Sequence, residues 1–455
     1  MFRKILIANR GEIAVTVIRA CRDMGILTVA VFSEADRDAL HVHLADEAIC
    51  IGPASSTDSY LNAQAILSAC LVSGAEAIHP GFGFLSENSA FVRMCQKIGV
   101  TFIGPDSQTM QLMGDKATAK KTALNAQVPV VPGSRDLPEN VSDALKAAQD
   151  IGFPVMIKAT AGGGGRGMRV AETAEELPRA YLSARQEARA CFGNDRVYLE
   201  RFIQNPHHVE VQILGDRFGN VIHLGDRDCS IQRRNQKMLE EARSPFISER
   251  TREAMYETSL RLAKSVQYVG AGTLEFLVDA DGSFYFMEMN TRIQVEHPIS
   301  EAVTSVNIVQ EQIRVAAGEP LSIRQKDIQF SGHAIECRIN AEDPLQNFRP
   351  APGKISELLL PGGNGIRIDS AIYQGYEVPP YYDSLLAKLI VWAPDRATAI
   401  SRMRRALTEF SIVGVPTTID FHLAILRDPE FIRGNYDIAY LTRKMPQFLA
   451  ALREQ

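Results

Sequence analysis

The chain has 455 residues, which exceeds one ordinary domain and predicts two or three. It is 45% hydrophobic and 23% charged, as ordered globular proteins are, and its net charge of −5 argues against a nucleic-acid or anionic-membrane partner. No apolar run reaches the roughly 18–20 residues of a membrane span, and the seven cysteines form no CxxC pair, which argues against a disulfide framework and favours a reducing cytoplasm.

The first hundred residues alternate between strand and helix patterns. Buried strands are predicted near 4–8, 27–32, 48–51, 76–78 and 100–103, and helices near 12–24, 61–72 and 89–98. Such alternation is typical of a parallel sheet with helices on both faces. The first turn, Asn9-Arg10-Gly11-Glu12, lacks the glycine fingerprint of dinucleotide folds, so we do not predict NAD binding.

The middle of the chain has a different pattern. A polar helix is predicted from Lys116 to Ala126, and strand-rich segments near 152–170 and 197–214 flank a helix at 174–190. This order predicts a small α+β module set into a larger domain. Helices near 249–266 and 307–317 follow, and the strands and Gly/Pro turns after residue 332 predict a third domain.

Gly162–Gly167 has the sequence GGGGRG and joins two extended segments, 154–159 and 168–172. Without side chains, such a loop brings backbone N–H groups close to phosphates, so we interpret it as a hairpin lid. The alternative is an ordinary surface turn, which needs fewer glycines. Lys158 lies in the apolar strand before the loop and requires either solvent or an anion, for which a phosphate is the economical partner.

An acidic hairpin is predicted near residues 270–290. The turn signal Asp279-Ala280-Asp281-Gly282 separates two apolar strands. If Val278 lies opposite Ser283, Glu275 and Glu288 share a face, about 7 Å apart, and Asn290 follows on that face. Two carboxylates and an amide suit Mg²⁺ that also holds nucleotide phosphates. The alternative, a solvated hairpin with exposed acids, fits the apolar flanks poorly.

Segments across nearly the whole chain, in order, resemble the biotin carboxylases, the ATP-grasp components of biotin-dependent carboxylases. The matching segments are IANRGEIA (7–14), HPGFGFLSEN (79–88), IGP (103–105), MGDK (113–116), KATAGGGGRGMR (158–169), HVEVQ (208–212), RDCSIQRRNQK (227–237), GAGTLEF (270–276), MEMNTRIQVEHP (287–298), GHAIECRINAEDP (332–344) and VPPYYDSLLAKLI (378–390).

The resemblance implies a mixed α/β and α+β fold in three domains. Residues 1–113 would form a parallel-sheet, Rossmann-like domain. Residues 114–330 would form an ATP-grasp domain whose mobile glycine-rich lid spans about 131–204. Residues 331–455 would form a C-terminal α+β domain.

The resemblance also implies cofactors and the residues that hold them. Mg²⁺ or Mn²⁺ would be bound by Glu275, Glu288 and Asn290. The ATP contacts would be Lys116, Lys158, Gly163, Gly164, Gly165, Arg166, Gly167, Glu200, Ile203, His208, Gln232, Asn235 and Leu277.

The implied reaction joins bicarbonate to biotin. Glu296 would be the base that deprotonates bicarbonate, and Arg338 would face the ureido oxygen of biotin. Bicarbonate would be held by Lys237, Arg292, Gln294 and Val295, and the biotin side would be shaped by Phe82 and Asp383. The family usually has Tyr at Phe82 and often His at Asn235.

Simpler interpretations remain for individual residues. Arg292 and Glu296 are four apart and would suit a surface ion pair, worth under about 1 kcal/mol. Arg338 would equally suit an ion pair with Glu336 or Glu342. His208 follows another histidine, and paired histidines are more often structural.

The resemblance implies a cytoplasmic subunit of acetyl-CoA carboxylase, with a pyruvate or other acyl-CoA carboxylase as the alternative. The chain contains no Met-Lys-Met biotinylation sequence, so we expect a separate biotin carboxyl carrier protein, carboxyltransferase subunits and a homodimer, with no nucleic acid or membrane. Two further alternatives are another ATP-grasp ligase, of carbamoyl-phosphate or purine synthesis, and a non-catalytic nucleotide-binding subunit.

Overall fold

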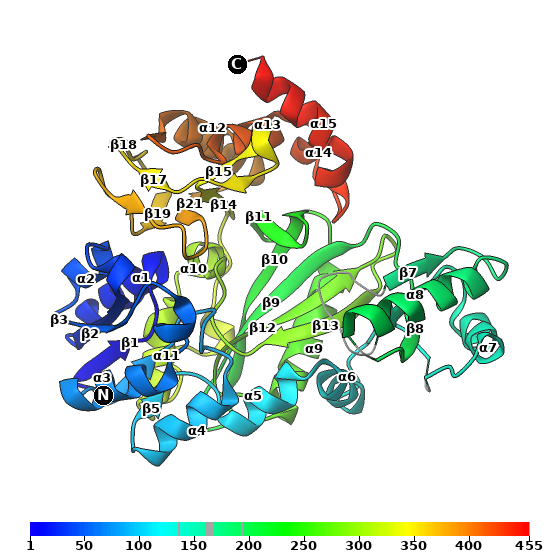
Figure 1. The fold of residues 1–455 in the computed structure, drawn as a ribbon, viewed down its shortest axis with the longest axis horizontal. Coiled ribbons are helices and arrows are strands. Elements are labelled where there is room, and N and C mark those ends of the chain that lie inside the picture. The colour runs from blue at the N-terminus through cyan, green and yellow to red at the C-terminus, as the bar shows by residue number, and fades with distance from the viewer. Residues whose placement is uncertain (135–136, 160–167, 193, 455) are drawn as a thin grey trace. The chain divides into compact units, whose positions relative to one another are not determined.

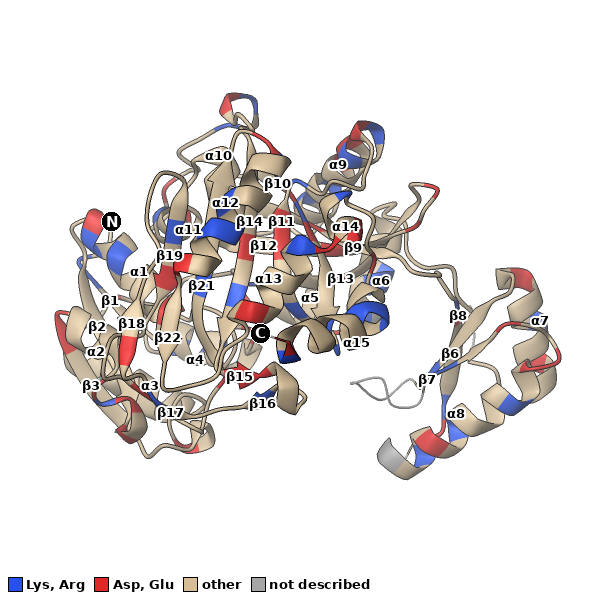
Figure 2. Ribbon diagram, turned by 90° about the horizontal axis from the view of Figure 1, so that it is seen from above, with Lys and Arg blue, Asp and Glu red and all other residues tan. Residues whose placement is uncertain are grey.

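The computed structural model describes residues 1–134, 137–159, 168–192 and 194–454 and divides into two compact units. The first comprises Met1–Val128, His207–Phe276 and Glu288–Gln455, and the second comprises Pro129–Pro206 and Leu277–Met287. Basic and acidic residues both occur on both units (Figure 2). Among the described helices, none is long and apolar enough to cross a bilayer.

The first unit begins with a parallel sheet of order β3-β2-β1-β4-β5 (Figure 1). Ile5 and Ile7 of β1 pack with residues of α1, whereas Leu6 packs with residues of α3 and α4. Both faces are therefore covered, which confirms the predicted arrangement. The elements are β1 (Lys4–Ile7), α1 (Gly11–Asp23), β2 (Leu27–Ser33), α2 (Leu40–Leu44), β3 (Glu47–Gly52), α3 (Ala63–Ser73), β4 (Ala77–His79), α4 (Ser89–Lys97), β5 (Thr101–Phe102), α5 (Ser107–Gly114) and α6 (Lys116–Asn125).

A second sheet has the order β13-β12-β9-β10-β11-β14-β21-β19, and its strand pairs from β9 to β19 are antiparallel. Cys337 of β14 and Leu389 of β21 belong to one hydrophobic cluster. Because side chains alternate along a strand, Arg338 and Lys388 point to the opposite face. The strands are β9 (His207–Gly215), β10 (Val221–Arg233), β11 (Gln236–Ala242), β12 (Gly270–Val278), β13 (Phe284–Asn290), β14 (His333–Asn340), β19 (Ile366–Ser370) and β21 (Leu385–Ala393).

Helices and short strand pairs complete the first unit. The helices are α9 (Glu249–Ser265), α10 (His297–Thr304), α11 (Ile308–Ala316), α12 (Arg396–Glu409), α13 (Ile419–Arg427), α14 (Pro429–Ile432) and α15 (Tyr440–Arg453). The short pairs are β15 (Glu342–Asp343) with β16 (Arg349–Pro350), β17 (Gly353–Lys354) with β20 (Glu377–Val378), and β18 (Glu357–Leu359) with β22 (Ser411–Val413).

The second unit is the predicted small α+β module. Its antiparallel sheet has the order β7-β6-β8, so the strands on either side of the glycine-rich segment do form a hairpin. Val155 and Leu199 pack against Ala148 and Tyr181 of the two helices. The elements are α7 (Val141–Ile151), β6 (Val155–Ala159), β7 (Met168–Ala171), α8 (Leu177–Phe192) and β8 (Val197–Arg201). Gly163, Gly164, Gly165, Arg166 and Gly167 lie outside the described residues.

The turn after β12 is tighter than the sequence predicts. The Asp279 N–H donates to the Ser283 carbonyl at 2.8 Å, and the Gly282 N–H donates to the Asp279 carbonyl at 3.0 Å. Asp279 rather than Val278 therefore lies opposite Ser283. Gly282 has φ +83°, a left-handed conformation that glycine adopts without strain. At the turn itself, the predicted pairing of Val278 with Ser283 was therefore wrong by one residue.

Glu241 on β11 is a fully buried acid that is paired with cations and hydrogen-bond donors. Its carboxylate accepts from Arg396 at 2.7 and 2.9 Å, from His333 at 2.7 Å and from Tyr436 at 2.8 Å. Burial alone would raise the pKa of Glu241, but Arg396 and His333 outweigh it and lower the pKa from 4.5 to about 2. The folded protein therefore favours the ionised form.

Glu241→Gln is expected to lower the free energy of unfolding at pH 7 by about 3 kcal/mol, because the pKa shift is a differential stabilisation of the carboxylate. This contribution is present above pH 4.5 and is lost as the pH falls toward 2. Urea unfolding of both proteins at pH 7, 4.5 and 3.5 checks it. A difference that stays constant across these pH values contradicts the assignment.

Candidate active site

A cavity of about 760 Å³ lies within the first unit. It brings together predicted residues that are far apart in the chain. Those that line it are Phe82, His208, Asn235, Lys237, Glu275, Glu288, Asn290, Arg292, Gln294, Val295, Glu296, Arg338 and Asp383. The two acids of the hairpin and Arg338 therefore share one cavity, as predicted.

Glu296 is a deeply buried acid of the cavity, with an exposure of 1%. It immediately precedes α10, and its carboxylate accepts from Lys237 at 2.6 Å and from Arg338 at 2.9 Å. Burial alone would raise the pKa of Glu296, but these two cations lower it well below its ordinary value. The side chain is thus a carboxylate at neutral pH, the form that a proton acceptor requires.

Lys237 on β11 lies among three carboxylates. Its ammonium donates to Glu210 at 2.6 Å, Glu275 at 3.1 Å and Glu296 at 2.6 Å. Burial would lower the pKa of Lys237, but the surrounding anions raise it well above its ordinary value. The lysine is therefore a fixed positive charge in the cavity.

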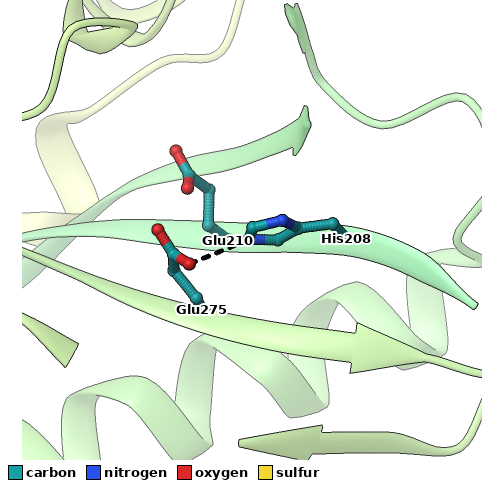
Figure 3. A group of neighbouring side chains, drawn as sticks. All are labelled: His208, Glu210 and Glu275. Atoms are coloured by element: carbon teal, nitrogen blue, oxygen red, sulfur yellow. Dashed lines mark ion pairs between the residues drawn. The ribbon is translucent and has the colours of Figure 1, made fainter. Parts of the chain in front are cut away.

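His208, Glu210 and Glu275 form a buried group on β9 and β12 (Figure 3). The His208 Nε2 lies 3.0 Å from the Glu275 carboxylate. Burial would lower the pKa of His208, but Glu275 more than compensates and raises it. Gln232 donates to the other ring nitrogen of His208 at 3.2 Å when that nitrogen is unprotonated.

Glu275 also accepts hydrogen bonds from two neutral side chains. The side-chain amides of Asn290 and Gln294 donate to its Oε1 at 2.9 and 2.7 Å. Burial would raise the pKa of Glu275, but Lys237 and His208 lower it well below its ordinary value. Glu288 pairs with Lys116 at 3.2 Å. Glu288 and Asn290, from the second strand of the hairpin, thus lie in the same site as Glu275.

Arg292 does not pair with Glu296. Its Nε donates to Glu87 at 2.9 Å, and its Nη2 donates to Asn290 at 3.1 Å. Glu87 also accepts from the backbone N–H of Thr291 at 3.1 Å. The simple surface-pair interpretation was therefore wrong, and the guanidinium is oriented along the cavity wall.

Arg338 likewise pairs with neither Glu336 nor Glu342. Its Nε donates to Glu240 at 2.6 Å and its Nη2 to Glu296 at 2.9 Å. Burial raises the pKa of Glu240 to about 7, partly opposed by Arg338. Arg338 is thereby fixed between an acid on β11 and the acid that precedes α10.

The sequence did not identify several residues that organise this cavity. Arg227 is fully buried and donates to Glu210 at 2.6 Å and to the side-chain amide oxygen Oε1 of Gln294 at 2.9 Å. That bond leaves the amino group of Gln294 for Glu275. Glu210 lies two residues after His208 on one strand, so period-two alternation was a usable signal, whereas Glu87, Arg227 and Glu240 had no local signal.

Two further predicted residues contact neighbours near the cavity, and a third has an unusual backbone conformation. The Phe82 carbonyl accepts from the Asn9 side chain at 2.7 Å. Asp383 accepts from the Leu385 N–H at 2.9 Å, which shapes the turn before β21. Asn235 has φ +64°, and asparagine tolerates this left-handed conformation better than most residues.

The remaining predicted nucleotide contacts that the structure describes belong to the second unit. Lys158 on β6 pairs with Glu200 on β8 at 2.5 Å, so a carboxylate satisfies the lysine that the sequence assigned to a phosphate. Ile203 is buried and Leu277 is half-buried. The structure thus pairs Lys158 with Glu200 and places Ile203 and Leu277 in the same compact unit.

Three family models match consecutive parts of the chain: the biotin carboxylase N-terminal domain at residues 1–110, the ATP-binding domain of the carbamoyl-phosphate synthase L chain at 115–324, and the biotin carboxylase C-terminal domain at 336–443.

Similar proteins match over nearly the full length. The chain is 59% identical to a biotin carboxylase of Nostoc sp., covering 97% of this chain and 98% of that protein. It is 54% identical to a pyruvate carboxylase subunit of Methanothermobacter thermautotrophicus, covering 95% and 88%. The biotin carboxylase domain dimer of Hydrogenobacter thermophilus 2-oxoglutarate carboxylase, solved with MgADP, ADP and bicarbonate, superposes with a TM-score of 0.89 at 52% identity, covering 99% of each chain.

Proposed function

The chain belongs to the biotin carboxylase family and is an ATP-dependent biotin carboxylase, and on this premise we propose its substrate, partners and residue roles. It carboxylates biotin on a carrier protein, with ATP and bicarbonate, as a component of acetyl-CoA carboxylase. Glu296 carries the proposal, because it is a buried carboxylate held by Lys237 and Arg338 in the cavity that also contains Arg292.

The first step activates bicarbonate. Lys237, Arg292, the Gln294 amide and the Val295 backbone hold the anion, and the planar guanidinium of Arg292 suits an oxyanion. Glu296 accepts the bicarbonate proton as a bicarbonate oxygen attacks the γ-phosphorus of ATP, and ADP leaves. The product is carboxyphosphate.

The second step carboxylates biotin. Carboxyphosphate breaks down to CO₂ and phosphate, and the phosphate removes the proton of the ureido nitrogen. Arg338 stabilises the negative charge that develops on the ureido oxygen. The nitrogen then attacks CO₂. Phe82 and Asp383 shape the biotin side of the cavity.

The proposed nucleotide contacts fall into three groups. Those in the first unit are Lys116, His208, Gln232 and Asn235. Those in the described second unit are Lys158, Glu200, Ile203 and Leu277. Gly163, Gly164, Gly165, Arg166 and Gly167 complete the set on the resemblance alone. The solved relative that binds MgADP supports a nucleotide site.

Glu275, Glu288 and Asn290 fit Mg²⁺ or Mn²⁺, because they present carboxylate and amide oxygens to one cavity. A bound ion supplies positive charge to the phosphate oxygens. Lys237 and His208 keep Glu275 ionised, and Lys116 pairs with Glu288. A cation therefore already lies beside each of the two acids.

Glu288→Gln is expected to raise the Mg²⁺ concentration for half-maximal activity by at least about 10-fold, because one charged oxygen ligand is lost. Titration of ADP release with Mg²⁺ measures it. Asp281→Asn, at an exposed acid on the turn of the same hairpin, is the matched control. Equal Mg²⁺ dependence of Glu288→Gln and wild type contradicts the metal assignment.

ADP release with bicarbonate, measured with and without free biotin, tests the proposed reaction. Biotin is expected to stimulate ADP release. Release that is indifferent to biotin favours another ATP-grasp ligase, and no release favours a non-catalytic nucleotide-binding subunit.

The carboxylase to which this subunit belongs is either acetyl-CoA carboxylase or a pyruvate or other acyl-CoA carboxylase. The Nostoc relative supports a free-standing biotin carboxylase, as in acetyl-CoA carboxylase, while the pyruvate carboxylase relative supports the alternative. Label transfer distinguishes them. The chain is isolated with its partner subunits and given labelled bicarbonate with acetyl-CoA or with pyruvate, and we expect label in the acetyl-CoA product.

The assembly is proposed to be a cytoplasmic homodimer that works with a biotin carboxyl carrier protein and carboxyltransferase subunits. The dimeric 2-oxoglutarate carboxylase domain supports the dimer. The three domain ranges, 1–113, 114–330 and 331–455, are part of the proposal, and the three family matches support them. The compact segment Pro129–Pro206 supports the proposed lid at about 131–204. Light scattering of the purified chain measures the oligomeric state.

A further inference from the structure

Lys388 is fully buried and has no role in the reaction described above. It lies on β21 directly opposite Arg338 of β14, on the face that borders the cavity. Its ammonium donates to the Val295 carbonyl at 2.9 Å and lies 3.1 Å from Glu12 and 3.7 Å from Asp369. A buried ammonium requires such partners, because its desolvation would otherwise be costly. Lys388 and Arg367 lower the pKa of Asp369 to about 2 against its burial, whereas burial raises the pKa of Glu12 to about 7, so Asp369 is the ionised partner at neutral pH.

The residues that Lys388 contacts come from separate parts of the chain. Glu12 lies on α1, Asp369 lies on β19, and Val295 lies in the irregular segment before α10. Two bonds from Arg367, each of 2.8 Å, hold Asp369 in place. Lys388 therefore contacts α1, β19 and the segment that contains Glu296 at the same time.

The segment Thr291–Glu296 is neither helix nor strand, so side chains help backbone N–H groups to hold its carbonyls. The Gln294 carbonyl lies 2.8 Å from the His297 Nδ1, and the next carbonyl, that of Val295, accepts from Lys388. Burial lowers the pKa of His297 well below its ordinary value, so this ring is neutral at pH 7. Lys388 is thus the charged donor at this point of the segment.

We propose that Lys388 is a positioning residue for bicarbonate, acting through the Val295 carbonyl, an inference that rests on the proposed function. The valine side chain has no polar group, so only the backbone at Val295 binds an anion. The peptide that Lys388 holds joins Val295 to Glu296. The Val295 N–H, the group able to donate to an anion, lies on the same Cα as the carbonyl that Lys388 holds, and Glu296 follows that carbonyl directly. Displacement of the carbonyl therefore moves the anion contact and the base together, whereas the nucleotide contacts proposed above lie outside the segment Thr291–Glu296.

Lys388→Met is expected to raise the KM for bicarbonate by roughly 10-fold or more and to lower kcat, since misplacement of reacting groups by about 1 Å has such effects. The KM for ATP should stay within about twofold. Lys388→Arg, which keeps a buried cation able to reach the carbonyl, should recover part of the loss. Lys444→Met, at a lysine of α15 paired with Asp428 and Glu430, is the matched control and should match wild type.

Removing Lys388 leaves Glu12 without its cation, so the single variant is also compared with Glu12→Gln/Lys388→Met, which removes both ionisable side chains. The same selective rise in bicarbonate KM in the double variant supports the inference if the single variant does not fold. An unchanged bicarbonate KM, or parallel changes in the KM values of both substrates, overturns it. Wild-type protein without bicarbonate-dependent ADP release overturns the proposed function itself, and this inference with it.

Discussion

Glu296→Gln is expected to reduce bicarbonate-dependent ADP release by roughly 10²- to 10⁴-fold, the usual contribution of a positioned base. Glutamine retains the size and hydrogen-bonding shape of Glu296 but accepts no proton. Lys237 keeps Glu210 and Glu275 as partners, and Arg338 keeps Glu240, so the cavity retains its paired charges. Initial rates at saturating ATP and bicarbonate measure the loss.

Two comparisons make this result specific. Glu253→Gln, at an exposed glutamate of α9, should retain wild-type activity. The KM for ATP should change little in Glu296→Gln, because its carboxylate acts on bicarbonate. A rate within about threefold of wild type contradicts the assignment of Glu296 as the base.

Arg338→Gln is expected to lower biotin-dependent turnover by roughly 10²- to 10³-fold, as loss of a donor to a developing oxyanion does. ADP release with bicarbonate but without biotin should fall by less than about 10-fold, since Arg338 acts mainly in the second step. The substitution also leaves Glu240 and Glu296 without a shared cation. Rates with and without free biotin separate the two steps.

The size of the two losses decides the role of Arg338. Arg404→Gln, at an exposed arginine of α12, is the control for loss of a positive charge. If the rate of ADP release falls equally with and without biotin, Arg338 only positions Glu296. That result contradicts a role at the ureido oxygen.

The sequence predicted the elements well where local patterns determine them. The alternation of buried strands and amphipathic helices through residue 103 predicted the parallel sheet, and turn chemistry located the loop at Asp279–Gly282. The pairing at that turn differed by one residue, because the left-handed Gly282 belongs to the turn and leaves Asp279 opposite Ser283. The helices α7 and α10 were not anticipated.

The ion pairs of the site could not be derived from spacing. Arg292 and Glu296 are four apart, but α10 begins only at His297, so helical neighbour rules do not apply to them. Glu240 meets Arg338 because β11 pairs with β14, a contact between residues 98 apart. The resemblance identified the cavity residues that local patterns could not, whereas Arg227, Glu210, Glu87 and Lys388 emerged from the fold.

The central proposal is that the carboxylates and guanidinium groups of one cavity catalyse ATP-driven carboxylation. Transfer of label from bicarbonate to free biotin tests it most directly. Wild-type protein with ATP, Mg²⁺ and labelled bicarbonate should form labelled carboxybiotin that requires ATP, with little label transferred by Glu296→Gln. ADP release that proceeds at full rate without any labelled carboxybiotin contradicts the account.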